Sequence, residues 1–414
     1  MRLAFLTHEP FFPPSGGGSA EAVYLVEEFV RRGHEVHVFG PALADADSVA
    51  ARMNIRIHGF TGWGMGRYTS LRTPKYLLYP FALARMVGRE AARTKFDLLL
   101  SQHTISAVAA GRLKRTLRVP VVMNFLDYLT GFMETWPAWT APRPLVRALM
   151  RFELSLPSRY QADGIMTVSD PLADCFADAG CPRGRILPIY YGYDSERFKP
   201  LEPGAPAPDH PVVVMHGSFD QHHLQAIARE AVLRVTAARP QVEFKFLGRE
   251  TATLRSFLGT VRAAAPRANL TTTGFVPYAD VAEHLASATV GIVPYEASRG
   301  THCAFVAKVV EYLGTGIPAV CTPLENVRRR FAAEPAVKFS GFDGASFGDA
   351  ILAWLDTRAA ERAAVGLAAS ERVKASLDWR VLASNAATFV EGVHASASAH
   401  APPAANQTPS AVSS

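Results

Sequence analysis

Residues Ala307–Thr322 read AKVVEYLGTGIPAVCT, and this stretch decides the class of fold. Three apolar residues fall on one helical face, as in a helix that packs on a sheet: Val309, Val310 and Leu313. A pair of glycines then breaks the pattern, and IPAV at 317–320 reads as a short buried strand with its proline near the start. A helix that runs directly into a strand is typical of α/β proteins.

Two polar residues stand out in the same stretch. Lys308 and Glu311 are three positions apart, so they share one side of the helix. Beside a glycine turn, a lysine and a glutamate could hold a ligand that carries both phosphate and hydroxyl groups. The alternative is an exposed ion pair that contributes only a few tenths of a kcal/mol. This segment alone leaves both interpretations open.

The length and composition indicate a two-domain globular protein. The chain has 414 residues, which is long for a single core, with 49% hydrophobic and 19% charged residues. No apolar run reaches the roughly 18 residues of a membrane-spanning helix. The opening MRLAFLTHEPF does not resemble a signal peptide, and the four cysteines show no zinc-site spacing. We therefore expect a cytoplasmic protein, kept in a reducing compartment.

The net charge of +6 is concentrated in the first half. Residues 1–200 hold 24 of the 43 Lys and Arg residues and 18 of the 37 Asp and Glu residues, which accounts for the whole excess. Many of these cations lie between Arg67 and Arg118, among aromatic and aliphatic residues. Such a tract favours a weak contact with an anionic membrane surface or a phosphate-bearing acceptor. An ordinary solvated helix face remains the alternative. Nucleic acid is not expected, because no binding motif for it is present.

Strands alternate with helices along both halves. In the first half a helix is expected at 21–32, and buried strands at 2–7, 35–39, 96–101, 119–123, 164–168 and 186–188. In the second half strands are expected at 212–215, 243–247, 270–272, 290–293 and 317–320. Alternation of this kind predicts two parallel sheets, each in its own Rossmann-like domain. Ligands tend to bind in the cleft between two such domains.

The expected domain boundaries follow from composition. Residues 1–200 form the first domain, and the proline-rich 201–211 forms a linker. Residues 212–375 form the second domain. A helix at 376–394 is expected to pack back toward the first domain. Residues 395–414 are rich in Ala, Ser and Pro, and we expect them to be disordered.

Several polar or glycine-rich segments follow predicted strands. Gly16, Gly17 and Gly18 precede the first helix, where backbone N–H groups could approach a phosphate or sugar. A plain flexible loop is the alternative, since the segment is not GxGxxG. His103 and Asp127 come just after two other strands, and either could contact a sugar hydroxyl. A purely structural role is open for both.

The segment after the first strand of the second half is rich in histidine. His216, His222 and His223 could suggest a metal site, with Ser218 between them. No cluster of carboxylates or cysteines accompanies them, so we expect no metal here.

Five segments in order carry a resemblance to a known family. They are the glycine-rich opening followed by RRGHEVHVF, then ADGIMTVSDPLADCFADAG, ILPIYYGYDSERFKP, TTTGFVPYADVAEHLASATVGIVPY and AKVVEYLGTGIPAVCT. Over about residues 1–393 the chain resembles glycosyltransferase family 4, two-domain enzymes of the GT-B fold. The resemblance implies transfer of a sugar from a nucleotide-diphosphate sugar to a glycan or lipid-linked acceptor, mostly with retention. It also implies cell-surface polysaccharide or glycolipid synthesis. Together with the basic first half, this leads us to expect a protein peripheral to the inner face of the membrane.

The resemblance also implies roles for residues. Glu311 would bind the donor ribose, because a carboxylate accepts from two neighbouring hydroxyls. Lys308 would lie near the donor sugar or phosphates, and the glycines at 16–18 near the diphosphate and acceptor. His103 and Asp127 become the catalytic candidates. The remaining donor-binding candidates are Gly217, Ser218, His222, Arg249 and Glu325. No cofactor and no metal are expected, because leaving-group charge is stabilised by cations and helix termini.

The sequence also departs from the family pattern. Many members carry a glutamate at the position of Cys303, and an Arg and a Lys where Ser218, His222 and His223 stand here. The donor diphosphate must then be neutralised by Arg249, the histidines or Lys308. Two alternatives therefore stay open beside the glycosyltransferase: a non-catalytic subunit that binds a sugar nucleotide, and a sugar-nucleotide 2-epimerase of similar fold.

Overall fold

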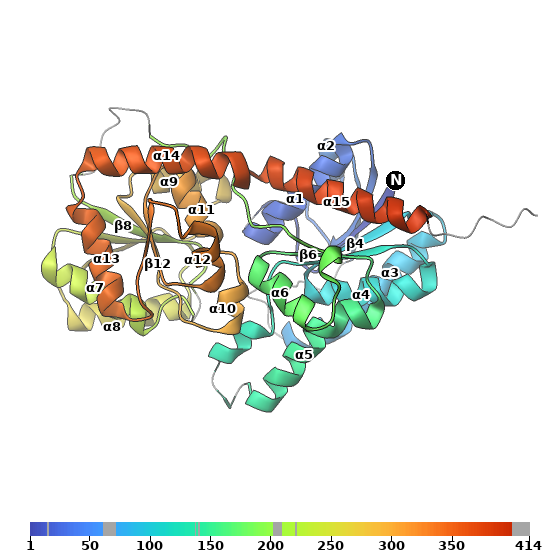
Figure 1. Ribbon diagram of the computed structural model, residues 1–414, viewed down its shortest axis with the longest axis horizontal. Helices are drawn as coiled ribbons and strands as arrows, with labels where there is room; N and C mark the ends of the chain where they lie inside the picture. Colours follow the sequence, from blue (N-terminus) through green and yellow to red (C-terminus); the bar gives the residue numbers. More distant parts are fainter. Residues whose placement is uncertain are drawn as a thin grey trace, which may run out of the picture.

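The computed structural model describes residues 1–14, 16–60, 72–136, 138–139, 141–201, 209–219 and 222–399, without the side chains of 72–76. Two parallel sheets, each flanked by helices, form two domains that lie side by side (Figure 1). The expected α/β architecture with two Rossmann-like domains is confirmed.

The N-terminal sheet has seven parallel strands in the order β3-β2-β1-β4-β5-β6-β7. Their bounds are β1 Arg2–Leu6, β2 Glu35–Pro41, β3 Arg56–Phe60, β4 Leu98–Gln102, β5 Val121–Phe125, β6 Gly164–Thr167 and β7 Ile186–Pro188. Strands such as β4 are buried along their whole length, which explains their continuous apolar runs. β1 pairs with both β2 and β4, so the strand order reverses there. Ligands of open α/β sheets bind at such a switch point.

The helices of this domain connect the strands as parallel crossovers. They are α1 Gly17–Arg31, α2 Ala46–Met53, α3 Arg72–Ala91, α4 His103–Leu117, α5 Arg143–Tyr160 and α6 Asp170–Asp178, with short 3₁₀ turns η1 Gly131–Thr135 and η2 Arg183–Arg185. Helix α5 and η1 project below the junction of the two domains (Figure 1). Among the described residues, no helix is long and apolar enough to cross a bilayer.

The C-terminal sheet has six parallel strands in the order β10-β9-β8-β11-β12-β13. Their bounds are β8 Val212–His216, β9 Glu243–Leu247, β10 Asn269–Thr272, β11 Val290–Val293, β12 Ala319–Cys321 and β13 Val337–Phe339. The helices are α7 Ala226–Ala238, α8 Ala252–Ala264, α9 Val281–Ala286, α10 Arg299–Cys303, α11 Ala307–Gly314, α12 Glu325–Phe331, α13 Gly344–Asp356 and α14 Ala359–Leu377, with a 3₁₀ turn η3 Tyr278–Asp280. Strand β12 begins two residues later than expected, because Ile317 and Pro318, which follow the turn at Gly316 (φ +75°), are outside the sheet ladder.

The end of the chain differs from its prediction. The helix expected at 376–394 is broken at Asp378, between the end of α14 and the start of α15 (Trp379–Ala399). At the break, the backbone of Tyr193 accepts a hydrogen bond from the Trp379 N–H and donates one to the Leu377 carbonyl. Tertiary pairing thus interrupts a continuous helical pattern. Residues 395–399 are helical, whereas disorder had been expected there; residues 400–414 lie outside the described part.

Helix α15 lies along the N-terminal domain beside α1 (Figure 1). Arg32 donates to Glu391 at 2.7 Å and to the Ser384 carbonyl and hydroxyl at 2.8 Å. His34 is 2.7 Å from the other oxygen of Glu391. This polar contact joins the last helix of the chain to the first domain.

The linker expected at 201–211 falls mostly on residues 202–208, which lie outside the described residues.

Candidate functional site

The glycine-rich turn after β1 is packed closely by side chains from other strands. A Cβ at Gly17 would come within 3.2 Å of the Tyr191 ring. One at Gly18 would come within 3.1 Å of Leu126 and 3.3 Å of His103. The glycines therefore allow the turn to lie directly against the loops that follow β4 and β5. The Gly18 carbonyl is also held by the Gln102 side-chain amide at 2.9 Å.

His103 stands at the switch point in an unusual backbone conformation. It follows β4 directly and has φ +68°, a left-handed value that is uncommon for a residue other than glycine. Its ring meets that of His8 edge-on at 4.7 Å, and its Nε2 lies 3.8 Å from a carboxylate oxygen of Glu9. Strain of this kind persists where the surroundings enforce it, often at functional sites. His8 and Glu9 belong to this cluster, and their position directly after β1 was the sequence signal for them.

A buried carboxyl group lies just behind the glycine-rich turn. Glu21 of α1 accepts hydrogen bonds from Asn124 at 3.1 Å and from Gln102 at 3.1 Å. Burial raises the pKa of Glu21 to about 7, and the two amides only partly oppose this rise. Sequence analysis missed Glu21, because a glutamate in an amphipathic helix reads as solvated. Asp127 lies half-buried on the loop just past β5.

In the C-terminal domain, a second polar group forms where β8 meets α11. The Nε2 of His216, the last residue of β8, lies 2.5 Å from Oε2 of Glu311, and both side chains are buried. The next residue, Gly217, has φ +100°, and a Cβ there would come within 3.0 Å of Lys308. The Lys308 ammonium donates to the Tyr295 hydroxyl at 2.7 Å. The structure therefore brings Glu311, Lys308 and Gly217 close together.

The histidines after β8 are arranged as an aromatic group. The His223 ring lies 4.3 Å from that of Tyr295, which also contacts Lys308. The His222 ring lies 5.1 Å from Phe132 of η1, so it reaches the other domain. Ser218 is half-buried just before them. His216 pairs with Glu311, and the described residues offer no set of three metal-ligating side chains here.

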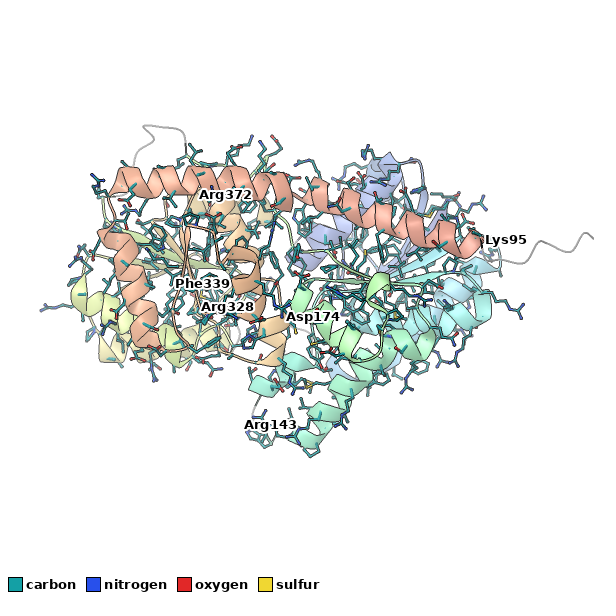
Figure 2. All side chains as sticks on the ribbon, in the orientation of Figure 1. Lys95, Arg143, Asp174, Arg328, Phe339 and Arg372 are labelled. Atoms are coloured by element: carbon teal, nitrogen blue, oxygen red, sulfur yellow. The ribbon has the colours of Figure 1, made fainter. Side chains whose placement is uncertain are left out.

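Two further donor-site candidates, Arg249 and Glu325, contact residues outside the group around Glu311. Arg249 lies just past β9, with its guanidinium 5.2 Å from the centre of the Phe275 ring. Glu325 begins α12 and pairs with Arg329 at 2.8 Å. Arg329 in turn donates to Asp174 of α6 at 2.7 Å, where the two domains meet (Figure 2). Glu325 is therefore part of an ion-pair network that joins the domains.

Helix α10 lies directly against the N-terminal domain. A Cβ at Gly300 would come within 2.4 Å of the Phe132 backbone, so only glycine fits there. The Ser169 hydroxyl donates to the Cys303 carbonyl at 2.5 Å, and the sulfur atoms of Cys175 and Cys303 are 3.9 Å apart. Cys303 is buried. In this position the side chain packs between domains, which explains why a small thiol can stand where a glutamate is common.

A hollow with several charged side chains in its lining lies beside this contact. It has a volume of about 510 Å³ and is lined by Tyr128, Glu134, Arg147, Met150, Arg151, Leu154 and Arg299. Arg147 and Arg151 come from α5 of one domain, and Arg299 comes from α10 of the other. Arg299 pairs with Glu134 at 3.7 Å. Three guanidinium groups against one carboxylate make the hollow suited to an anion.

Comparisons with known proteins agree with this architecture. Residues 16–192 match a model described as a glycosyl transferase 4-like domain, and residues 210–357 match the glycosyl transferases group 1 model. A search of curated proteins finds no match.

Solved structures of other proteins share the fold. A sucrose-phosphate synthase from Thermosynechococcus elongatus superposes with a TM-score of 0.78 at 16% identity, covering 95% of this chain and 99% of that chain. Anabaena HepE in complex with UDP and glucose superposes with a TM-score of 0.68 at 15% identity, covering 95% of this chain and 100% of that chain. The complex of the same protein with UDP-glucose superposes with a TM-score of 0.67 at 15% identity, covering 96% of this chain and 100% of that chain. At sequence identities this low, the structural similarity shows only that these proteins share a fold with this chain.

Proposed function

Because the chain belongs to glycosyltransferase family 4 and has the GT-B fold, we propose that it uses a nucleoside-diphosphate sugar as donor. The sugar would pass to a glycan or lipid-linked acceptor, with retention of configuration. One structural relative was solved with UDP-glucose, which supports a donor of this class. The bond from the anomeric carbon to the phosphate oxygen breaks, and a bond from that carbon to an acceptor hydroxyl oxygen forms. The nucleoside diphosphate leaves and takes up the proton of that hydroxyl.

The group formed by Glu311, Lys308, Gly217 and His216 carries this proposal. A carboxylate has room for several donors, so Glu311 can accept from His216 and from two ribose hydroxyls together. His216 fixes the orientation of that carboxylate before a ligand arrives. Lys308 lies three residues earlier on the same helix and places a cation near the phosphates of the same donor.

The leaving diphosphate needs positive charge around it. We assign this role to Lys308, with Arg249 and the histidines at 222 and 223 as further contributors, because the family's usual Arg and Lys pair is absent. Such preorganised cations act on the charge that develops as the bond breaks. On the opposite side of the cleft, we place His103 and Asp127 against the transferred sugar or the acceptor.

The surface of the N-terminal domain favours an anionic or lipid-linked acceptor. The arginine-lined hollow, which we call the Arg147 hollow, lies between the domains and is suited to a phosphate or another anion. On α3, Leu77, Phe81, Arg85 and Arg89 follow one another at intervals of four and are all exposed. This stripe is apolar at one end and basic at the other. It supports a weak contact with the inner face of a membrane, in cell-surface glycan or glycolipid synthesis.

A non-catalytic subunit that binds sugar nucleotides is the second candidate. The observation that favours it is the replacement of the usual cation pair by Ser218 and the histidines. A 2-epimerase is a third candidate, but it would need acid–base groups on both sides of the donor sugar.

Two measurements separate these candidates. A thermal-shift screen against UDP-, GDP- and ADP-sugars should identify a donor that raises the melting temperature. With that donor, nucleoside diphosphate should be released only when a glycan or lipid-linked acceptor is added. Binding without any release would favour the non-catalytic subunit. Interconversion of the donor sugar without acceptor would favour the epimerase.

A further inference from the structure

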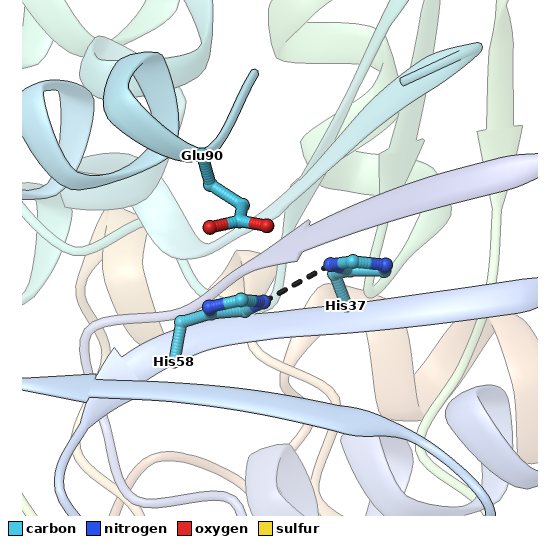
Figure 3. Close-up of side chains that lie close together, drawn as sticks. All are labelled: His37, His58 and Glu90. Carbon is cyan, nitrogen blue, oxygen red and sulfur yellow. Dashed lines mark hydrogen bonds between the residues drawn. The ribbon is translucent and has the colours of Figure 1, made fainter. Parts of the chain in front are cut away.

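A second polar cluster lies away from the cleft, at the edge of the N-terminal sheet. It consists of His37 on β2, His58 on the edge strand β3 and Glu90 near the end of α3 (Figure 3). One ligand atom from each residue lies within 4.8 Å of the other two. His37 is fully buried and the other two are half-buried. Within the described part of the chain, no other His, Cys, Asp or Glu residues gather in this way.

One ring nitrogen of each histidine points toward the other histidine. Nδ1 of His37 and Nε2 of His58 are 3.0 Å apart (Figure 3). On its other side, Nε2 of His37 lies 3.1 Å from a carboxylate oxygen of Glu35. A carboxylate accepts, so this contact keeps a proton on Nε2 and leaves the Nδ1 lone pair of the neutral ring directed at the cluster. A carboxylate behind a histidine is the usual outer partner of a metal-bound imidazole.

The ring orientations are fixed by aromatic packing. Phe39 stacks on His58 with ring centres 4.4 Å apart, and Phe96 meets His37 edge-on at 5.1 Å. These contacts hold the two nitrogens in place without a ligand. Preorganised ligands lose little conformational entropy when an ion binds.

The local charge also suits a cation. Glu90 supplies one negative charge directly to the cluster, and its Oε1 accepts from the Thr94 hydroxyl at 3.1 Å. Two arginines beside the cluster are held by Glu35, with Arg2 at 2.9 Å and Arg56 at 3.4 Å from its oxygens. Glu35 therefore balances these cations at the same time as it orients His37.

We propose that His37, His58 and Glu90 bind a divalent transition-metal ion of the zinc type. Two imidazole nitrogens, one carboxylate oxygen and a water would complete a four-coordinate shell. Bonds of about 2.0–2.2 Å in that geometry put neighbouring ligand atoms roughly 3.3 Å apart. The two nitrogens, 3.0 Å apart, already have nearly this spacing, whereas the Glu90 oxygen, within 4.8 Å of both, must move closer when the ion binds. His58 then carries its proton on Nδ1.

The ion in this position would be structural. His37 is the third residue of β2, whereas the cleft lies at the carboxyl ends of the strands. The ion would join the edge strand β3, its neighbour β2 and helix α3. It would stabilise the edge of the sheet and take no part in sugar transfer.

The test is a calorimetric titration of tag-free, chelator-treated full-length protein with Zn²⁺, with Co²⁺ absorption as a second readout. We expect one ion per chain, visible Co²⁺ bands of a four-coordinate site, and a higher melting temperature with Zn²⁺. His58→Asn and Glu90→Gln should each weaken Zn²⁺ binding at least tenfold. Because both residues are half-buried, these variants should fold, which circular dichroism can check. His222→Asn, in the other histidine group, is the matched control and should bind like the wild type.

Two results would overturn the proposal. Absence of Zn²⁺ binding to the wild-type protein would show that the imidazoles are only a hydrogen-bonded pair. Wild-type affinity in both His58→Asn and Glu90→Gln would place the ion elsewhere, and a loss of binding in His222→Asn would locate it in the cleft.

Discussion

His216 and Glu311 are joined by a 2.5 Å contact between Nε2 and Oε2, although 95 residues separate them. One ends the first strand of the C-terminal sheet, and the other lies on the helix before β12. The contact fixes the carboxylate that we assign to the donor ribose. It also gives a role to the histidine at the end of β8, where no metal had been expected.

Lys308 is expected to bind the phosphates of the donor. Lys308→Met should weaken binding of nucleoside diphosphate by about 1.5–3 kcal/mol, the scale of a hydrogen bond to a charged group. Binding of the nucleoside alone should change little, because it lacks the phosphates. Titration calorimetry with both ligands measures the difference. Lys374→Met, an exposed lysine on α14, is the control. Equal losses for nucleoside and nucleoside diphosphate would contradict this assignment.

Glu21 is expected to make stability depend on pH. Its pKa is about 7 in the folded protein and near 4.5 in an unfolded chain. The buried carboxyl therefore favours folding fully below about pH 4.5, and this contribution is lost as the pH rises through 7. Glu21→Gln removes the ionisation, so the variant should gain stability relative to the wild type between pH 5 and pH 8, by up to roughly 3 kcal/mol.

Chemical denaturation of Glu21→Gln at several pH values measures this gain. Glu27→Gln on the same helix is a weaker comparison, since burial raises the pKa of Glu27 but Arg52 opposes the rise. A constant difference between wild type and Glu21→Gln across the range would show that Glu21 stays ionised in the folded protein.

Arg32 is expected to hold α15 on the N-terminal domain. Its guanidinium contacts Glu28, Glu391 and Ser384, and its side chain is only 19% exposed. Arg32→Ala should lower the free energy of unfolding by about 1–3 kcal/mol and increase hydrogen exchange in α15. Arg31→Ala is a matched control, because Arg31 binds Glu28 but not α15. Equal effects of the two substitutions would show that the contact with α15 contributes nothing.

The exposed stripe on α3 is expected to bind anionic membranes weakly. Each Arg near an anionic surface contributes about 1 kcal/mol, and salt screens it. Sedimentation with phosphatidylserine vesicles should be clear at low salt and largely lost at high salt, with little binding to phosphatidylcholine alone. The double variant Arg85→Gln/Arg89→Gln should sediment less with phosphatidylserine vesicles at low salt. The double variant Leu77→Ser/Phe81→Ser should reduce the binding that remains at high salt. No sedimentation with either vesicle would make the stripe an ordinary solvated face.

The sequence predicted most strands because buried parallel strands are apolar along their length. It missed β3, whose RIHGF contains a charge, a histidine and a glycine at a sheet edge, and β13, which has only three residues. Not all residues of the basic tract between Arg67 and Arg118 are on the surface. Tyr79 is fully buried, and its hydroxyl donates a hydrogen bond to the Thr7 carbonyl. Tyr76 has no described side chain.

The candidate site was predictable where its residues share one local motif. Lys308, Glu311 and the Gly217 turn could be found because each lies at a recognisable strand or helix boundary. Glu21 could not, since its significance comes from burial and from contacts with distant segments. His8 and Glu9 were missed although their position just after β1 was a signal for them. The bond from Arg329 to Asp174 likewise depends on how α12 approaches α6, which no local pattern encodes.

The donor affinity of Glu311→Gln tests the central claim most directly. With the nucleotide sugar found by thermal shift, titration calorimetry should show binding weaker by about 1.5–3 kcal/mol, because one charge-assisted acceptor of the ribose hydroxyls is lost. Glu283→Gln, an exposed glutamate on α9, should bind like the wild type. Unchanged donor affinity in Glu311→Gln would contradict the assignment of the donor site to the end of β8 and helix α11.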